Sequence, residues 1–326
     1  MAMQYGKIPG INKKVSRIVQ GTIMLAMNQL EAGIEMLDMV TAHGVTAFDT
    51  AHIYMGGDSE RVLGEWMQRR GNREDVMIMS KGCHPNRDRK RVTPYDLTSD
   101  LMDSMARLQT DYIDLYILHR DDPDLPVGPI VEEFNQHIQA GRIHGYGGSN
   151  WTHARIQEAN DYANAHGLVP MTVSSPNFGL AEQVENPWGP GCVTLAGPQE
   201  AEARDWYQAN QMPVFAYSSI ARGFFSGRVK SNDPEGAKQI LDGAAQKGYA
   251  YPVNFQRLAR AEELAAEKGV SVPQIAIAYI LDSPLNVFPL VASYTEAEMV
   301  DNLKAFTVQL TPQECAWLDL CSETRS

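Results

Sequence analysis

The sequence predicts an α/β fold, a single barrel of eight parallel strands with helices between them, written (β/α)8 and also called a TIM barrel. Short apolar segments alternate along the chain with amphipathic stretches, which is the pattern of parallel strands joined by crossover helices. The apolar segments approach eight in number, and no internal repeat or interdomain linker is visible. The length of 326 residues alone fits one large barrel or two ordinary domains. With the segment pattern added, we expect one domain over residues 1–326.

The expected strands are short apolar segments spread along the whole chain. Because parallel strands of a barrel point their carboxyl ends at one mouth, polar residues just past them are candidates for an active site. In chain order the strands are Ile18–Gly21, Thr46–Phe48, Val76–Ser80, Tyr112–Leu118, Ile143–Gly147, Met171–Ser174, Pro213–Ala216 and Val287–Leu290.

Amphipathic helices fit between these strands. Two helix starts, at Thr93-Pro94 and Thr311-Pro312, have the pattern of an N-cap, Pro at the first helical position and an acidic residue in the first turn. The second predicts an extra C-terminal helix. The helices between the strands are expected over Leu30–His43, Ser59–Arg69, Pro94–Leu108, Val127–Ala140, Thr152–His166, Pro198–Asn210, Asn254–Lys268 continuing after Pro273 to Leu281, and Glu296–Ala305.

Two long connections break the regular spacing, and both follow strands, so both are expected at the catalytic mouth. Asn177–Gly197 is rich in Gly and Pro, and Arg222–Val253 is polar with some helix-permissive stretches. Long loops in compact domains are usually functional lids or disordered insertions. Aromatic residues are unusual in disordered tracts, which favours lids; the aromatic residues are Phe178, Trp188, Phe224 and Phe225.

The formal net charge of −12 argues against a nucleic-acid partner, which needs clustered Lys and Arg. The longest basic run, Arg87–Arg91, contains an acid and fits a solvated loop. Four scattered cysteines, without paired Cys or His spacing, suggest neither a zinc site nor a disulfide framework. No signal peptide or bilayer-spanning apolar segment is visible. We therefore expect a cytoplasmic protein with free thiols and no membrane partner; the sequence leaves the oligomeric state open.

Four polar residues follow expected strands and are candidates for one active site: Asp49, Tyr54, Lys81 and His119. A Tyr beside a Lys that is tied to a carboxylate is a proton donor, and we expect its pKa to lie below the ordinary value of about 10. This combination predicts acid–base chemistry on a carbonyl or an alcohol.

The flanking residues form longer motifs: Gly44–Ala51 followed by Tyr54 and Gly57–Gly64, Leu118-His119-Arg120, Gly141–Trp151, and Phe215–Gly227. In this order they resemble the first signature, the strand-4 histidine, the strand-5 motif and the strand-7 cofactor loop of the aldo-keto reductases. The resemblance runs from about Gly21 to about Leu318. It implies a nicotinamide-dependent oxidoreductase that reduces an aldehyde or ketone, or runs the reverse oxidation. Tyr54 would be the acid, Lys81 and Asp49 would ease its proton release, and His119 would orient the carbonyl or relay the proton.

Cofactor binding has to be argued without a Gly-x-Gly-x-x-Gly fingerprint, which follows none of the strands and whose absence disfavours a Rossmann domain. The resemblance implies that Ser149 and Asn150 hold the nicotinamide amide and that Tyr217 stacks on the ring. The small-residue loop after Tyr217 would approach the pyrophosphate with its backbone N–H groups. The full expected set for NADP or NAD is Gly21, Thr22, Asp49, Ser149, Asn150, Ser174, Tyr217, Ser218, Ile220, Arg222, Gly223, Ser293, Glu298 and Asn302.

Two departures from the family pattern concern this cofactor. Where a strand-6 Gln is usual, the chain has Val173–Phe178, and Ser174 is a shorter stand-in. NADP-preferring members hold the 2′-phosphate with a Lys and an Arg, whose places align with Ala292 and Glu298, while Ser293 is kept. A carboxylate at Glu298 would repel that phosphate, so we expect a shift towards NAD.

These residues are also compatible with two other kinds of site. Lys81 at a strand end is also how Schiff-base aldolases are built, but that chemistry needs a neutral amine and Asp49 favours the ammonium form. His52 and His84 have no third metal ligand at suitable spacing, so no metal is expected. Substrate contacts are expected from His52, His84, Arg120, Trp151 and Trp188. The expected substrate is a small-molecule carbonyl or alcohol, with a sugar-like compound as one alternative. The alternative of another class is a cofactor-binding regulatory subunit, because potassium-channel β-subunits resemble the same family.

Overall fold

The computed structural model describes residues 2–325, which group into two compact units. The first unit comprises Met3–Ser175 and Ala292–Thr295. The second comprises Pro176–Val291 and the segment from Glu296 onward, together with Ala2. The prediction of a single domain is not tested by this division and stays a prediction.

Eight parallel strands close into a barrel in the order β10-β3-β4-β5-β6-β7-β8-β9. The predicted (β/α)8 fold is therefore confirmed, and every predicted strand is found within two residues of its expected ends. The strands are β3 (Val19–Gly21), β4 (Ala47–Asp49), β5 (Met77–Gly82), β6 (Ile113–Leu118), β7 (Ile143–Ser149), β8 (Val173–Ser175), β9 (Val214–Ala216) and β10 (Val287–Val291).

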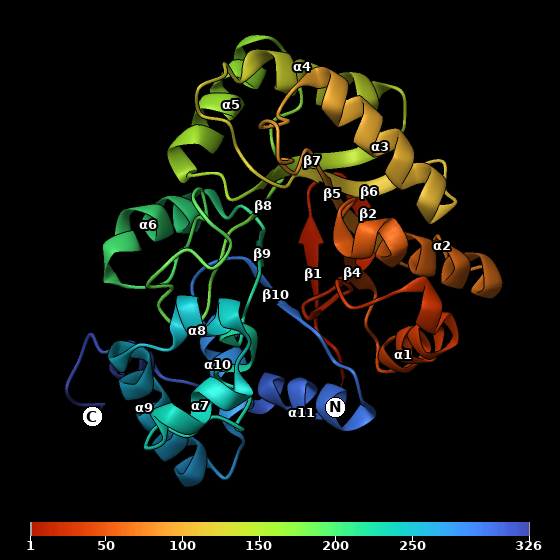
Figure 1. Ribbon diagram of the computed structural model, residues 1–326. Coiled ribbons are helices and arrows are strands. Elements are labelled where there is room, and N and C mark those ends of the chain that lie inside the picture. Colours follow the sequence, from red (N-terminus) through yellow and green to blue (C-terminus); the bar gives the residue numbers. More distant parts are fainter. Residues whose placement is uncertain (1, 326) are drawn as a thin grey trace. The chain divides into compact units, whose positions relative to one another are not determined.

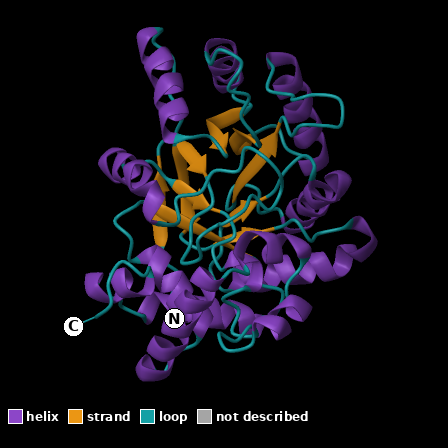
Figure 2. Cartoon of the chain, turned by 60° about the vertical axis from the view of Figure 1, so that its left-hand side comes forward, coloured by secondary structure: helices purple, strands orange, loops and turns teal. Residues whose placement is uncertain are grey.

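Helices of the first unit lie outside its strands, as Figures 1 and 2 show. Every residue of β5 and β6 is buried, as expected of strands covered on both faces. Thr93 caps α3 by accepting a hydrogen bond from Asp96 N, as its sequence predicts. The helices of this unit are α1 (Leu30–Ala42), α2 (Asp58–Arg70), α3 (Pro94–Leu108), α4 (Gly128–Gln139) and α5 (His153–Ala165).

The second unit contains two short helices that the sequence analysis had placed in a long loop. Asp233 accepts from Gly236 N and Asp242 accepts from Ala245 N, so each caps the start of one helix. Phe224 and Phe225 are fully buried in the hydrophobic core of this unit, which makes them core residues rather than lid residues. The helices are α6 (Ala201–Asn210), α7 (Pro234–Ile240), α8 (Gly243–Tyr249), α9 (Pro252–Lys268), α10 (Val272–Leu281), α11 (Glu296–Lys304) and α12 (Pro312–Leu318).

The extra C-terminal helix is confirmed as α12. Thr311 and Glu314 form a capping box at its start, and Trp317 and Leu318 bury its apolar face in the same core as residues of α9. Within residues 2–325, no single helix is long and apolar enough to cross a bilayer; α9 and α10 reach that length only together, across a bend of 99°.

A hairpin at the start of the chain was missed by the sequence analysis. Strands β1 (Tyr5–Ile8) and β2 (Ile11–Ser16) pair antiparallel, and Gly10 turns between them with φ +81°. From β2, Lys13 pairs with the buried Asp114 at 2.9 Å. The hairpin escaped notice because its buried apolar residues, Ile8, Ile11 and Val15, are separated by polar residues and follow no regular alternation.

Candidate active site

Asp49 and Lys81 end neighbouring strands, and their side chains meet. Asp49 of β4 pairs in register with Met79 of β5. Lys81 lies two residues further along β5, so its side chain is on the same face of the strand as that of Met79. Lys81 Nζ donates to Asp49 Oδ1 and, at 2.9 Å, to the carbonyl oxygen of Thr50. The side chains are only 3% and 5% exposed. The lysine is thereby held as a buried ammonium group with a carboxylate partner.

Tyr54 reaches the same place from the single turn of 3-10 helix, Tyr54–Gly57, that follows β4. Its phenol oxygen lies 3.4 Å from Lys81 Nζ, and the ammonium nitrogen lies 4.9 Å from the ring centroid. Met55 and Gly56 adopt φ of 49° and 65°, which turns the chain sharply after the tyrosine. The turn thus presents the hydroxyl of Tyr54 to the lysine.

His119, just past β6, completes the group. Its ring lies edge-on to Tyr54, with centroids 5.7 Å apart, and edge-on to His84 at 4.8 Å. The ring atom Nδ1 is buried and has no hydrogen-bond partner among residues 2–325. Because an unpartnered buried N–H is costly, the tautomer with the proton on Nε2 is favoured, which leaves that N–H as a donor for a carbonyl oxygen.

Burial dominates the electrostatics of this cluster. It raises the pKa of Tyr54 above its usual value, and the Lys81 charge acts against that rise without overcoming it. The sequence predicted a lowered pKa for Tyr54; the structure differs because burial of the phenol raises the pKa by more than the Lys81 charge lowers it, and the Asp49 charge adds to the rise. Burial works to lower the pKa of Lys81, but Asp49 and Tyr54 outweigh it and the pKa is raised. Burial and Lys81 hold the pKa of His119 well below its usual value. At neutral pH the group is therefore a neutral phenol, an ammonium and a neutral imidazole.

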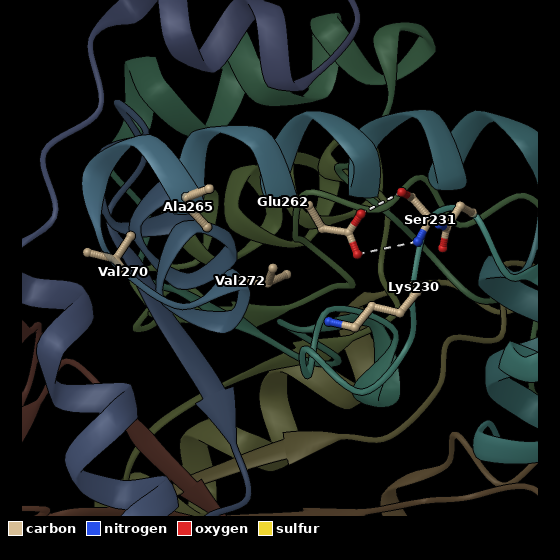
Figure 3. Close-up of a pocket in the computed structure, with 8 residues that line it drawn as sticks. Lys230, Ser231, Glu262, Ala265, Val270 and Val272 are labelled. Atoms are coloured by element: carbon tan, nitrogen blue, oxygen red, sulfur yellow. Dashed lines mark hydrogen bonds between the residues drawn. The ribbon is translucent and has the colours of Figure 1, made fainter.

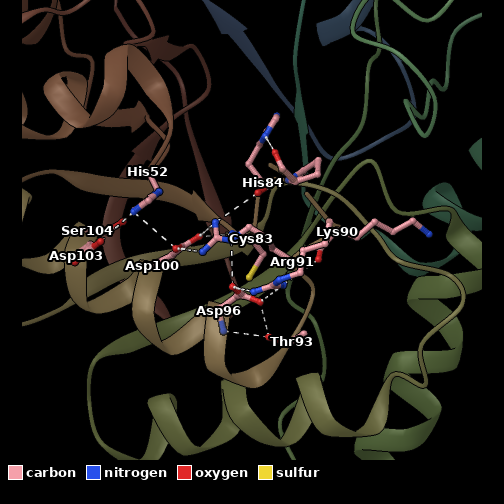
Figure 4. Close-up of polar contacts among 12 residues, drawn as sticks. His52, Cys83, His84, Lys90, Arg91, Thr93, Asp96, Asp100, Asp103 and Ser104 are labelled. Carbon is pink, nitrogen blue, oxygen red and sulfur yellow. Dashed lines mark hydrogen bonds and ion pairs between the residues drawn. The ribbon is translucent and has the colours of Figure 1, made fainter. Parts of the chain in front are cut away.

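An ionic network fixes the loop that follows β5, as Figure 4 shows. Cys83 has φ +59°, and its backbone N–H donates to Asp100 Oδ2 of α3 at 2.8 Å. Arg91 donates to the other oxygen of Asp100 at 2.6 Å. Arg89 donates to both oxygens of Asp96. The network therefore fixes the part of the loop that adjoins His84, and the ring of His84 packs edge-on against that of His119.

The expected substrate residues are placed differently from one another. His84 is partly buried beside His119, and Arg120 Nη1 donates to the carbonyl oxygen of His119 at 3.4 Å. His52 is turned onto α3, where its Nε2 lies 3.3 Å from Asp103 and 3.7 Å from Asp100. Trp151 is fully buried and donates to the carbonyl oxygen of Arg120 at 3.3 Å. His84 and Arg120 are thus adjacent to the candidate catalytic residues, while the side chains of His52 and Trp151 are bonded to residues of the surrounding fold.

At the ends of β7 and β8, polar groups gather. Ser149 pairs in register with Ser175 and donates to its carbonyl oxygen at 2.8 Å, and Asn150 donates to Ser149 Oγ at 3.1 Å. Ser175 Oγ is buried without a hydrogen-bond partner among residues 2–325. Ser174, the residue predicted from the sequence, is also fully buried and stays a candidate. Ser175 is an additional candidate that the sequence did not suggest, indicated by its register opposite Ser149 and its unpartnered hydroxyl.

In the second unit, Trp188 lies edge-on to Tyr217 with centroids 5.7 Å apart. Arg222 lies 5.3 Å from the Trp188 ring centroid and forms an ion pair with Asp242. The turn after Tyr217 uses left-handed backbone at Ser218, Arg222 and Gly223, with φ of 54°, 51° and 91°. Ile220 lies within this turn and accepts from Gly223 N.

The remaining expected cofactor residues lie at strand ends and on α11. Gly21 of β3 pairs in register with Asp49, and Thr22 donates to the Asp49 carbonyl oxygen at 2.9 Å. Ser293 is fully buried, and its N–H donates to Gln20. On α11, Glu298 is exposed in the first turn and Asn302 is buried.

A hollow of about 460 Å³ lies elsewhere, within the second unit (Figure 3). Lys230, Ser231 and residues of α9 line it, and Ser231 donates to Glu262. None of the four candidate catalytic residues lines this hollow. Among residues 2–325, no group of three or more His, Cys, Asp or Glu side chains is arranged to hold a metal ion.

The sequence model of the Aldo/keto reductase family matches residues 17–323. The chain belongs to the aldo-keto reductase family. The resemblance noted from its motifs is therefore confirmed.

Individual relatives are distant but cover most of the chain. A probable voltage-gated potassium channel subunit beta from Oryza sativa subsp. japonica is 28% identical, over 95% of this chain and 94% of that protein. Aldo-keto reductase YhdN from Bacillus subtilis is 26% identical, over 86% and 82%. Norsolorinic acid reductase stcV from Emericella nidulans is 26% identical, over 87% and 70%.

A solved structure shares the fold. The crystal structure of the thermostable aldo-keto reductase Tm1743 in complex with the inhibitor epalrestat superimposes with a TM-score of 0.73. It has 22% sequence identity, and the match covers 98% of this chain and 100% of that one.

Proposed function

We propose that this aldo-keto reductase is an NAD(P)H-dependent enzyme that reduces an aldehyde or ketone to an alcohol. One observation carries the proposal: the Tyr54 hydroxyl lies against an ammonium group, Lys81, that is paired with Asp49, and the His119 ring lies beside it. Family members in general use a nicotinamide cofactor and act on small carbonyl compounds.

Each residue of the group has a role in reduction. When bound, the reduced nicotinamide supplies a hydride to the carbonyl carbon. Negative charge then develops on the carbonyl oxygen, and Tyr54 donates the proton that neutralises it, a contribution of typically 10²–10⁴-fold. Lys81 stabilises the phenolate that this leaves, and Asp49 keeps Lys81 charged. Neutral His119 donates a hydrogen bond that orients the carbonyl oxygen.

The strand-end polar groups fit a nicotinamide amide. Such a group offers N–H donors and a carbonyl acceptor, and Ser175 Oγ is a buried hydroxyl that lacks a partner within residues 2–325. Ser149 and Asn150 supply the neighbouring hydroxyl and amide. Gly21, Thr22, Ser174, the turn Tyr217–Gly223, Ser293 and Asn302 are proposed to complete the cofactor contacts. An exposed carboxylate at Glu298 supports a shift towards NAD, because a 2′-phosphate would meet a like charge there.

The experiment is a panel of aldehydes, ketones and sugars, with NADH and NADPH supplied separately and cofactor oxidation followed at 340 nm. Cofactor oxidation that depends on a carbonyl substrate supports the proposed reductase activity. Some relatives are described as potassium channel β-subunits, so a regulatory subunit is the second candidate. Cofactor that quenches Trp fluorescence, with no carbonyl of the panel reduced, would favour that candidate.

A further inference from the structure

Arg120 carries a positive charge that no carboxylate neutralises among residues 2–325. It follows His119 at the end of β6 and is partly buried. Its Nη1 donates to the His119 carbonyl oxygen at 3.4 Å, and its own carbonyl oxygen accepts from Trp151 Nε1. The hydrogen bond from Trp151 thus fixes the backbone of Arg120. The guanidinium of Arg120 keeps N–H donors that bond to no carboxylate among residues 2–325.

The neighbouring charges are already paired with one another. Asp121 lies 3.3 Å from Arg155, and Asp122 lies 2.6 Å from Lys90. In the basic loop after β5, Arg89 and Arg91 are bound by Asp96 and Asp100. The basic run that stands out in the sequence is therefore largely neutralised, and the free charge beside the catalytic group comes from Arg120.

The charge of Arg120 acts on the catalytic side chains themselves. It works to lower the pKa of Tyr54, of His84 and of His119, although burial is the larger cause at each of the three. A guanidinium that influences all three lies within electrostatic range of the place where a carbonyl substrate must sit.

The two histidines beside it are unsuited to binding an anion. Burial lowers the pKa of His84, so its ring is neutral at pH 7. His84 Nδ1 lies 2.8 Å from the Pro85 carbonyl oxygen and must donate to it, which leaves Nε2 as an acceptor. His119 is neutral as well.

We propose that the carbonyl substrate bears an anionic group, a carboxylate or a phosphate, that Arg120 binds. The inference rests on the proposed function and adds the substrate class to it. A guanidinium matches the geometry of either anion with two parallel N–H donors, and it cannot lose its charge at any physiological pH. The neutral His84 is left to contact the uncharged part of the same molecule.

The test compares each acid with its own neutral ester. We would measure kcat and KM for 4-oxobutanoate and its methyl ester, and for 4-formylbenzoate and its methyl ester. Glyceraldehyde 3-phosphate against glyceraldehyde tests phosphate as the alternative anion. The expected result is that the parent prefers the anion in at least one pair by about tenfold to a hundredfold in kcat/KM, mainly through KM. The pair with the larger preference identifies the anion.

Variants then assign this preference to Arg120. Arg120→Met should reduce the anion-to-neutral ratio at least tenfold, and Arg120→Lys should keep part of it. The ratio is the readout because a displaced His119 or an altered Tyr54 would slow both members of a pair alike. Arg87→Met is the matched control: Arg87 is an exposed arginine of the basic loop, and removing it should change the ratio less than twofold. An unchanged ratio in Arg120→Met, or an equal fall in Arg87→Met, would overturn the proposal.

A binding measurement separates this inference from the proposed function. Calorimetric titration with benzoate and with inorganic phosphate needs no turnover. If neutral aldehydes are reduced but no anion is preferred and neither titrant binds through Arg120, the proposed anionic substrate class is wrong. The proposed reductase activity is then still supported. If no carbonyl is reduced yet benzoate or phosphate binding is lost in Arg120→Met, the anion site stands and the reductase is wrong.

Discussion

At the residue scale, the buried phenol of Tyr54 is expected to set how the proposed reduction depends on pH. Burial raises its pKa above the ordinary value of about 10, so the proton-donating form persists throughout the neutral range. A lowered pKa keeps His119 uncharged where an ordinary histidine, near 6.5, would begin to protonate. We therefore predict that kcat for reduction is constant from about pH 6 to 9 and falls only above pH 10, while the reverse oxidation accelerates as pH rises.

Stopped-flow measurement of hydride transfer across this range checks that prediction, because it separates chemistry from product release. A fall in the reduction rate centred near pH 7 would contradict the assignment of a neutral phenol.

Glu298 is the residue on which cofactor preference is expected to depend. We predict that the parent binds NADH within tenfold of NADPH, or more tightly. Glu298→Arg should shift the preference towards NADPH by about 1–2 kcal/mol, through a charge-assisted hydrogen bond to the 2′-phosphate. Calorimetric titration with both cofactors measures it, and Glu296→Arg, an exposed acid on the same turn of α11, is the control. A parent protein that binds NADPH a hundredfold tighter would show that the phosphate is held elsewhere.

Some site residues could be predicted from the sequence, whereas properties that depend on burial or strand register could not. Asp49, Tyr54, Lys81 and His119 could be selected because each follows an apolar strand, and the structure brings them together. The raised pKa of Tyr54 could not be foreseen, since it depends on how much protein surrounds the phenol. Ser175 could not be added as a candidate from the sequence, because its place opposite Ser149 depends on the register of β7 and β8.

At the scale of elements, α3 is expected to stabilise the loop after β5 through Asp100. Asp100 is 2% exposed and accepts from both Arg91 and the Cys83 backbone. Asp100→Ala leaves the buried Cys83 N–H and the partly buried Arg91 guanidinium without this acceptor, and we predict a loss of about 2–4 kcal/mol in the free energy of unfolding. His84 follows Cys83 in the chain and should lose its fixed position in the same variant. Because His84 is an expected substrate contact, KM should rise as well.

Urea unfolding and steady-state kinetics measure the two effects. Asp103→Ala is the matched control, because Asp103 lies on the same helix with 59% of its side chain exposed and should cost no more than about 0.5 kcal/mol. Equal losses in the two variants would show that the network contributes little.

Elements were predictable where periodicity and caps agree. The strands and the long helices follow from their patterns, and α12 follows from Thr311 and Glu314. The two short helices α7 and α8 were missed because seven residues carry too little periodicity, even though Asp233 and Asp242 cap them. The β1–β2 hairpin was missed because its buried apolar residues, Ile8, Ile11 and Val15, do not alternate regularly with polar ones.

At the scale of the whole molecule, the sequence predicts one domain. Hydrogen exchange read by mass spectrometry in increasing urea tests this, because it follows β6 of the first unit and α9 of the second separately. We expect both segments to lose protection at the same urea concentration, as a single cooperative transition requires. Two well-separated midpoints would show that the compact units fold independently.

The central claim is that Tyr54 donates the proton in a nicotinamide-dependent carbonyl reduction. The most direct measurement is a single turnover of cofactor-loaded parent and Tyr54→Phe protein with a carbonyl substrate from the panel, together with cofactor titration of both. Phenylalanine keeps the ring and removes only the hydroxyl. We predict a rate at least about 10²-fold lower in Tyr54→Phe, with the cofactor Kd changed less than about threefold. An undiminished rate would contradict the claim.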